Sequence, residues 1–305
     1  MEYPKTLMEF EQQFNTEEAC IEYLFKIRWP QGFKCMKCGY DKAWTTKQNL
    51  FRCTKCEFKN SVIAGTIFQD SKKPLRLWFH AMWHLTNQKY GANALGLQRI
   101  FGFGSYRTAW TWLHKLRHAM VRPGRDRLSG TVDIDEIYIG GKRAGKRGRG
   151  AEGKALVFVA VESKGNRIGR IRLKRISDAS AGSLEPAIKG AVEPGTIINT
   201  DDWRGYSGVS KIGYKHEIVH KSSEVGVNLL PRVNIIASLL KRWLLGTYQG
   251  RIQAPFLDYY LDEFIFRFNR RTSGSRGKLF YRLVQQAMTI NPLPVKKICS
   301  QGIDS

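Results

Sequence analysis

The chain is short of acidic residues. It has 26 Asp and Glu against 50 Lys and Arg among 305 residues, which gives a formal net charge of +24. The imbalance is uneven, because residues 1–30 hold six acids and three bases (net −3) and the rest of the chain therefore carries +27. A surface this basic disfavours cationic partners and attracts polyanions, of which nucleic acid is the commonest in a cell. A charged surface kept only for solubility is the alternative.

Long hydrophobic runs are also missing. The longest apolar stretches are far shorter than a membrane-spanning helix, and the N-terminus MEYPKTLMEF lacks the charged-then-apolar layout of a signal peptide. We therefore expect an intracellular protein with no membrane partner. The hydrophobic content of 42% and the aromatic content of 12% predict a folded chain, and the length allows about two domains.

Cysteine is scarce as well, with six residues, yet four of them form a regular pattern. Two C-x2-C pairs, separated by fourteen residues, contain Cys35, Cys38, Cys53 and Cys56. Two residues between cysteines let a short turn point both thiolates at one ion, and two such turns complete a tetrahedron. The spacing predicts a structural zinc site in a small ribbon, with disulfides as the less favoured alternative.

Helical periodicity dominates the first part of the chain. It predicts helices at about residues 5–29 (one or two), 74–90, 93–101 and 105–120. The last pair flanks the tight turn FGFGS and has the length of a helix-turn-helix. Its second helix carries Arg107, Thr111 and Lys115 opposite the apolar stripe, as a recognition helix does for the major groove. An ordinary helical pair with a solvated basic face is the alternative.

From Thr131 onward the pattern is typical of an α/β domain. Three strand patterns (TVDIDEIYIGG, ALVFVAVE and RIGRIRLKRI) are followed by a helix at about 180–190 and two further strands, TIINT and KHEIVH. Two long helices at about 231–246 and 255–270 end the domain.

The few acids of this half stand at strand ends. Asp133 and Asp135 lie on one face of a predicted strand, because side chains alternate, and Asp201 and Asp202 follow directly after another strand. Carboxylates at adjacent strand ends can converge on divalent metal, and a pair of Mg²⁺ ions supports phosphodiester chemistry. Each aspartate on its own could equally serve in a turn or a cap.

Several segments in order carry a resemblance: the four-cysteine ribbon, then GSYRTAW, VDIDEIYIGGK, NTDDWRGY, ASLLKRWLLGTYQG and YLDEFIFRFNRR. Over roughly residues 15–288 the chain resembles bacterial insertion-sequence transposases of the DDE class. It is most similar to the zinc-ribbon branch, in which Asn followed by a Lys takes the third acidic position. The resemblance implies a ribonuclease-H-like fold with metal-binding residues on the first strand, after the fourth strand and on a later helix.

Carried onto this sequence, the resemblance implies four catalytic residues: Asp135, Asp201, Asn234 and Lys241. The first three would bind Mg²⁺ (or Mn²⁺), and the lysine would position a DNA phosphate. Most DDE enzymes have Glu at the third position, and Asn offers an amide oxygen without a charge. Asp262 and Glu263, in YLDEF, are the rival third acids.

The helix at 231–246 suits this role on its own residues. Asn234, Ser238 and Lys241 form one polar line along it, beside apolar residues that can pack: Ile235, Ile236, Leu239, Leu240, Trp243 and Leu244. The alternative is an Asn satisfied within the core beside a Lys whose ammonium reaches solvent.

Two basic stretches are predicted to hold DNA. GGKRAGKRGRGAEGK, between the first two strands, is too rich in glycine to form a helix. We expect it to clamp phosphates with Lys142, Arg143, Lys146, Arg147 and Arg149. The stretch RFNRRTSGSRGK supplies Arg270 and Arg271 for the DNA backbone.

The sequence thus predicts a multi-domain α/β protein: an N-terminal helical segment (1–30), a zinc ribbon (31–62), a helix-turn-helix-like DNA-binding segment (70–122), a ribonuclease-H-like mixed-sheet catalytic domain (128–288) and a tail (289–305). The implied reaction cleaves phosphodiesters at the terminal inverted repeats of an insertion sequence and joins the freed 3′-hydroxyls to target DNA. The expected partners are double-stranded DNA and further copies of the chain, as a homodimer or higher oligomer in the bacterial cytoplasm at the nucleoid. A non-catalytic DNA-binding regulator and a simple nuclease are the alternatives.

Overall fold

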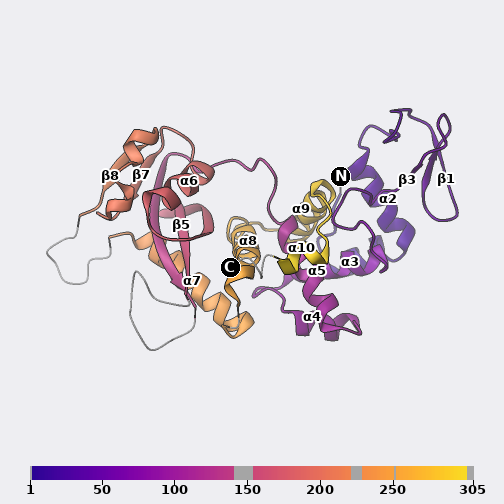
Figure 1. The fold of residues 1–305 in the computed structure, drawn as a ribbon. Helices are drawn as coiled ribbons and strands as arrows, with labels where there is room; N and C mark the ends of the chain where they lie inside the picture. The colour runs from indigo at the N-terminus through magenta and orange to yellow at the C-terminus, as the bar shows by residue number, and fades with distance from the viewer. Residues whose placement is uncertain (1, 141–153, 221–228, 251, 301–305) are drawn as a thin grey trace. The chain divides into compact units, whose positions relative to one another are not determined.

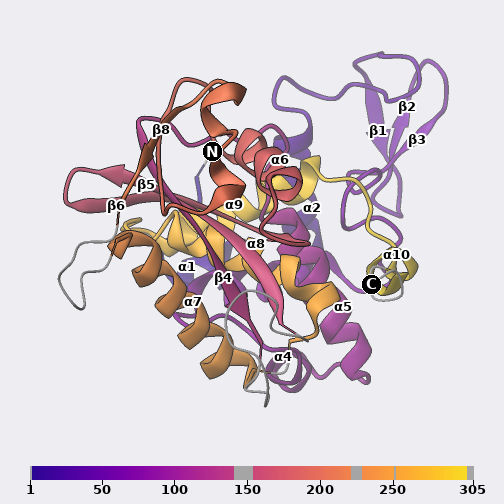
Figure 2. The ribbon, with the colours of Figure 1, turned by 60° about the vertical axis from the view of Figure 1, so that its left-hand side comes forward.

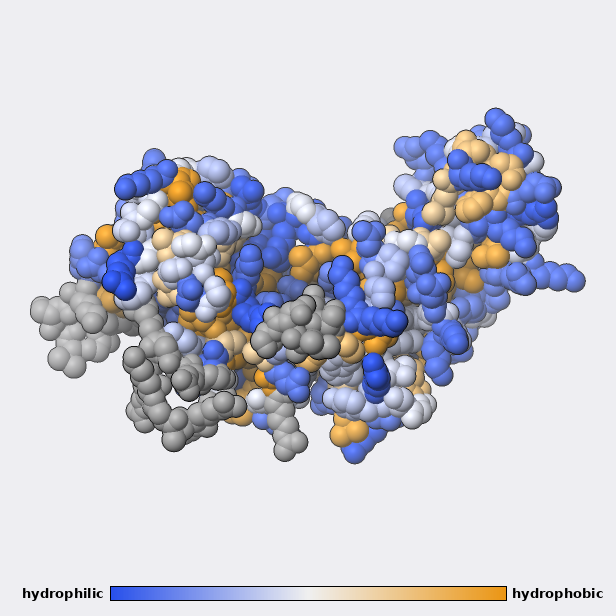
Figure 3. Space-filling view, viewed as in Figure 1, coloured by the Kyte–Doolittle hydropathy of each residue, from blue (hydrophilic) through white to orange (hydrophobic). Residues whose placement is uncertain are grey.

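The computed structural model describes residues 2–140, 154–220, 229–250 and 252–300. The chain divides into two compact units. Unit 1 comprises residues 1–123 and 272–303, and unit 2 comprises residues 124–271. Hydrophilic side chains cover much of the visible surface of each unit, in keeping with the high charge (Figure 3). None of the helices in the described ranges is both long and apolar enough to span a bilayer.

Unit 1 is a helical body with an attached ribbon. Its helices are α1 (Leu7–Gln13), α2 (Glu17–Arg28), α3 (Leu75–Asn87), α4 (Ala94–Phe101), α5 (Tyr106–Ala119), α9 (Arg276–Thr289) and α10 (Val295–Ser300). Aromatic rings fill its centre, where Phe14 contacts Phe79 and Phe280 with ring centroids 4.9 and 5.6 Å apart. These rings come from α3, α9 and the end of α1, so a helix late in the sequence completes a core begun at the N-terminus (Figure 1).

The position of α9 differs from the predicted domain limits. The predicted catalytic domain, 128–288, includes α9, whereas the structure packs α9 against α3 in unit 1. Gly277 explains the close fit, because a Cβ there would lie 1.5 Å from the carbonyl oxygen of Pro4. The amphipathic pattern of α9 predicts a buried face but does not say which core buries it.

The ribbon consists of three short strands, β1 (Ala43–Thr45), β2 (Phe51–Cys53) and β3 (Lys59–Asn60), in the order β1-β2-β3 and all antiparallel. A sheet this small buries little apolar area and therefore needs another source of stability. Its four cysteines, two of them in the turn before β1 and two at the end of β2 and just after it, supply one.

Unit 2 is built on a five-stranded mixed sheet of order β6-β5-β4-β7-β8. The strands are β4 (Thr131–Ile139), β5 (Ala155–Lys164), β6 (Arg167–Ile176), β7 (Ile197–Thr200) and β8 (Lys215–Ile218). The first three form an antiparallel meander, and β7 and β8 add to β4 in parallel. This order and polarity are those of a ribonuclease-H-like sheet, as the sequence predicts.

Helices cover both faces of this sheet. On one face α6 (Ala181–Ala191) packs on a core that includes Val132 and Ile134 of β4. On the other face α7 (Pro231–Tyr248) and α8 (Leu257–Phe268) pack on Ile137 of β4 and on valines of β5. Short 3₁₀ turns span Arg204–Tyr206 (η1), Val209–Ile212 (η2) and Ala254–Phe256 (η3). Figure 2 shows α6 and α7 on different sides of the strands.

Candidate active site

The pairing of β4 with β7 brings two of the predicted catalytic aspartates to one edge of the sheet. The strands are parallel, and Asp133 lies opposite Asn199. Two residues further along the chain come Asp135, in the middle of β4, and Asp201, the first residue past the end of β7, so both carboxylates lie where β7 leaves β4. The Oδ1 atom of Asp201 accepts a hydrogen bond from the backbone N–H of Trp203 (3.2 Å), which holds the carboxylate in the turn after β7.

Asp133 has a different environment from Asp135, although the two side chains share a face. Asp133 is only 2% exposed, and its carboxylate accepts hydrogen bonds from Asn199 Nδ2 (2.9 Å) and Arg232 Nη1 (3.1 Å). Because Arg232 belongs to the first turn of α7, this ion pair fixes α7 on the sheet. Asp133 therefore makes a structural ion pair, whereas Asp135 is half-buried.

A third carboxylate and a tyrosine, which no sequence pattern singles out, complete this edge. The hydroxyl of Tyr206 donates a hydrogen bond to Glu136 Oε1. Burial raises the pKa of Tyr206 well above its ordinary value, and the charges of Glu136, Asp135 and Asp201 raise it further. All three carboxylates therefore lie close enough to act on one phenol. Strand alternation places Glu136 on the opposite face from Asp135, so the sequence gives little sign of this cluster.

Helix α7 presents its polar line to solvent. Asn234, Ser238 and Lys241 are exposed, and Asn234 Nδ2 donates a hydrogen bond to the carbonyl of Leu230 (3.2 Å). An exposed Asn carries no burial penalty, so a buried, satisfied core role for Asn234 is excluded. Among the apolar residues expected to pack, Ile235 is an exception, because it is 49% exposed. The role of Asn234 and Lys241 in binding metal and phosphate stays a prediction.

The rival third acids on α8 have partners of their own. Glu263 is fully buried and accepts hydrogen bonds from Arg267 Nε (2.9 Å) and from the hydroxyl of Tyr248 (3.2 Å). The charge of Asp262 interacts with that of Arg125. Glu263 therefore serves the packing of α7 against α8, which explains an acidic residue in a helix core.

The residues predicted to contact DNA fall into three groups. Those of the glycine-rich loop, Lys142, Arg143, Lys146, Arg147 and Arg149, lie outside the described residues. Arg270 and Arg271 stack on Phe266 and Phe268, and both donate to backbone carbonyls. On α5, Arg107 is exposed and Lys115 half-buried, but Thr111 is only 6% exposed, so Thr111 does not stand open on that face; DNA contact by these residues stays a prediction.

The four ribbon cysteines form the predicted metal site. Their Sγ atoms all lie within 4.8 Å of one another, and the Cys35–Cys56 and Cys38–Cys53 pairs are 3.6 Å apart. Sulfurs bound tetrahedrally at about 2.3 Å from zinc are separated by roughly 3.8 Å, so this donor set fits the ion. Burial raises the pKa of the Cys35 thiol, but hydrogen bonds from the backbone of Cys38 and Lys37 and from Asn60 outweigh it and bring the pKa to about 6.

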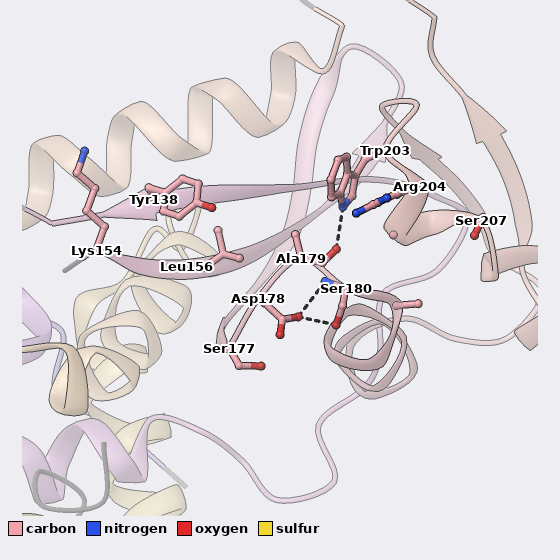
Figure 4. A pocket seen from close by; sticks show the side chains of 12 residues that line it. Tyr138, Lys154, Leu156, Ser177, Asp178, Ala179, Ser180, Trp203, Arg204 and Ser207 are labelled. Carbon is pink, nitrogen blue, oxygen red and sulfur yellow. Dashed lines mark hydrogen bonds between the residues drawn. The ribbon is translucent and has the colours of Figure 1, made fainter. Parts of the chain in front are cut away.

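A pocket of about 720 Å³ opens beside the Asp201 turn, on the α6 side of the sheet. Figure 4 shows the Trp203 indole at one end of it and Tyr138 with Lys154 at the other. The indole Nε1 donates to the carbonyl of Ala179 (2.7 Å), so the turn that holds Asp201 is also tied to the start of α6. With Arg204 in the wall, both ends of the pocket carry a base beside an aromatic ring.

The sheet order, the paired carboxylates and the cysteine ribbon define a zinc-ribbon protein with a ribonuclease-H-like domain. Comparison with known families makes the assignment more specific. Residues 127–269 match the ISXO2-like transposase domain, and residues 15–58 match the transposase zinc-ribbon domain. The chain therefore contains a transposase zinc-ribbon domain and an ISXO2-like transposase domain, which is consistent with an insertion-sequence transposase.

Individual relatives are distant. The chain is 25% identical, over 283 residues, to an uncharacterized protein in transposable element ISH50 of Halobacterium salinarum, covering 83% of this chain and 93% of that protein. Among solved structures it is similar to the catalytic core domain of BIV integrase, at 14% identity and a TM-score of 0.31, over 50% of this chain and 94% of that one. It is also similar to a chain of a simian T-cell lymphotropic virus intasome complex, at 14% identity and a TM-score of 0.32, over 67% of this chain and 74% of that one.

Proposed function

We propose that this transposase binds the terminal inverted repeats of its insertion sequence, cuts a phosphodiester bond at each end and joins the freed 3′-hydroxyls to target DNA. The observation that carries the proposal is the parallel register of β4 and β7, which pairs Asp133 with Asn199 and so brings Asp135 and Asp201, two residues further on, next to each other where β7 ends. In a chain of net charge +24, neighbouring carboxylates at a strand edge repel the phosphates of DNA unless a cation lies between them.

The donor set suits a hard divalent cation. Asp135 and Asp201 would hold Mg²⁺ or Mn²⁺ through carboxylate oxygens, and Asn234 would add a neutral amide oxygen. Such a cation lowers the pKa of bound water and stabilises charge on a departing oxygen. The residues of the chain do the rest: the turn at Trp203 fixes the Asp201 carboxylate, and the exposed Lys241 ammonium positions a phosphate.

Both chemical steps balance without a protein nucleophile. In the first, a water oxygen bonds to phosphorus and the bond from phosphorus to the 3′-oxygen breaks, which leaves a 3′-hydroxyl. In the second, that hydroxyl bonds to a target phosphorus, loses its proton to solvent and displaces a target 3′-oxygen. Two ends must be joined together, so we propose a homodimer or larger assembly on double-stranded DNA.

A strand-transfer assay on labelled linear DNA that bears the ends of the element tests this proposal. With Mg²⁺, wild type should cut and join the DNA. Asp135→Ala and Asp201→Ala should each lose at least about 100-fold in rate, because a metal ligand supports several kcal/mol of barrier lowering. Asp202→Ala is the matched control, since Asp202 is exposed and adjacent but lies past the shared edge.

The outcomes separate the alternatives. If Asn234→Ala also loses joining, the neutral Asn belongs to the active site; if it does not, Asn234 is an ordinary exposed residue. Wild type that cuts but never joins, even when given precut 3′ ends, is a simple nuclease. Wild type that binds the ends and neither cuts nor joins them is a DNA-binding regulator.

A further inference from the structure

The predicted recognition face of α5 forms one wall of a pocket in unit 1. Its volume is about 460 Å³, and Arg107, Thr111 and Lys115 line it from α5. The opposite side comes from the loop at residues 70–73, with Val295 of α10 closing part of the rim. A face flanked in this way by the 70–73 loop and by α10 cannot lie flat along the floor of a major groove, as a recognition helix must.

The floor of the pocket is rigid. Trp78 and Trp112 stack with ring centroids 3.6 Å apart and planes 10° from parallel, and both are buried. The Trp78 indole donates to Ser71 Oγ (2.8 Å), which fixes the 70–73 loop over the stack. Helix α10 is anchored too, because Ile298 is fully buried and Arg107 contacts Cys299 Sγ at 3.8 Å. The pocket is therefore preorganised rather than an accident of surface side chains.

The lining is strongly basic. Four cations, Lys72, Lys73, Arg107 and Lys115, face one acid, Asp70, which gives a net charge of +3. Within the described residues, none of the four cations has a carboxylate oxygen at ion-pairing distance. Hydroxyls of Ser105, Thr108 and Thr111 add neutral hydrogen-bond donors. Cations and hydroxyls around a small opening are the groups that bind a phosphate.

The environment of Lys115 disfavours its positive charge when the pocket holds no anion. It is half-buried, and burial lowers the pKa of its ammonium while the charge of Asp70 acts in the opposite direction. An anion in the pocket would compensate the remaining charge. The N-terminus of α5, capped by Ser105, lies at the same opening and adds its own positive end.

We infer that this pocket holds a backbone phosphate of duplex DNA, so that α5 positions the DNA through its backbone and does not read its bases. The inference rests on the proposed DNA-binding function and makes it more specific. It assigns Lys72 and Lys73 to the interface together with Arg107 and Lys115, and it leaves base reading to other elements.

The test measures the affinity of the full-length protein for two short duplexes of unrelated sequence, over a range of salt. Lys115→Gln and the double variant Lys72→Gln/Lys73→Gln should each weaken binding to both duplexes alike, by about 10-fold, and flatten the slope of log affinity against log salt by about one. Arg107→Gln should do the same, with an unchanged melting temperature as the check that loss of its contact with Cys299 leaves α10 in place. Lys89→Gln, an exposed lysine of the same unit outside the pocket, should change affinity less than 2-fold.

Four results would overturn the inference, the last of them together with the DNA-binding proposal on which it rests. Loss confined to one duplex would mean that α5 reads bases, and equal loss in Lys89→Gln would mean that only total charge matters. Unchanged DNA affinity in all pocket variants would mean that the pocket does not bind DNA. If wild type binds neither duplex, the DNA-binding proposal itself is wrong. In that case, inorganic phosphate that raises the melting temperature of wild type but not of Lys115→Gln would show that the pocket binds free phosphate. Conversely, if strand transfer fails while the pocket variants still weaken DNA binding as predicted, only the catalytic proposal is wrong.

Discussion

At the scale of single residues, burial separates aspartates that the sequence makes look alike. Asp133 and Asp135 stand two apart on one strand and point to the same side, and alternation alone cannot rank them. The contact of Asp133 with Arg232 settles the difference, because a carboxylate held by a guanidinium and an amide already has its charge compensated. The resemblance implies that Asp135 is the metal ligand, and the pairing of Asp133 is consistent with that prediction.

This ion pair makes a prediction about stability. Arg232→Met would leave the Asp133 carboxylate buried without its cation, which should lower the free energy of unfolding by about 3 kcal/mol. Urea denaturation monitored by circular dichroism would measure it. The double variant Asp133→Asn/Arg232→Met should recover much of the loss, whereas Arg242→Met, at an exposed position of α7, should stay within about 0.5 kcal/mol of wild type. Equal effects at 232 and 242 would contradict a structural role for the pair.

At the scale of elements, local patterns predict most helices and strands but not their neighbours. The strands β4 and β6 follow from alternation, β5 follows from its continuous apolar run, and the helix pair α4 and α5 follows from the turn between them. Thr111 shows the limit: it is only 6% exposed, and it lines a pocket together with the 70–73 loop and Val295 of α10, which are distant in sequence. The Glu136–Tyr206 contact also joins residues 70 positions apart, and no local pattern signals it.

The packing of α9 against the N-terminal segment can be tested at this scale. Gly277→Ala should lower the free energy of unfolding by about 1–3 kcal/mol, because the added methyl group would overlap the Pro4 carbonyl and push α9 off the N-terminal segment. Gly274→Ala is the control, since a Cβ there meets nothing within 4 Å. Thermal melts of both variants would show it. A neutral Gly277→Ala would mean that α9 does not belong to the core of unit 1.

Zinc removal tests the ribbon. We expect one zinc ion per chain, released by chelator and absent in Cys38→Ser, with Cys299→Ser retaining it because Cys299 lies outside the cluster. Without the ion, residues 31–62 should become the first sites of limited proteolysis, since so small a sheet depends on its metal. Metal content and peptide mapping would measure both. Zinc retained in Cys38→Ser would contradict a four-cysteine site.

At the scale of the whole molecule, unit 2 is inserted in the chain between two parts of unit 1. The sequence shows the change of pattern near residue 124 but not the return near residue 272, because α9 looks like any amphipathic helix. Charge, in contrast, is a whole-chain property, and composition alone is enough to indicate a polyanionic partner. The acidic residues of unit 2 are the exception, and we propose that they give this basic molecule a place for metal.

The most direct test of the central claim is metal-directed cleavage of the protein backbone. Fe²⁺ substituted for Mg²⁺, with ascorbate and peroxide, produces radicals that cut the chain close to the bound ion. If Asp135 and Asp201 share one metal site, wild type should be cut near both residues, and both cuts should disappear together in Asp135→Ala and in Asp201→Ala while persisting in Asp202→Ala. Cuts near only one of the two aspartates, or cuts that survive in either single variant, would contradict the shared site.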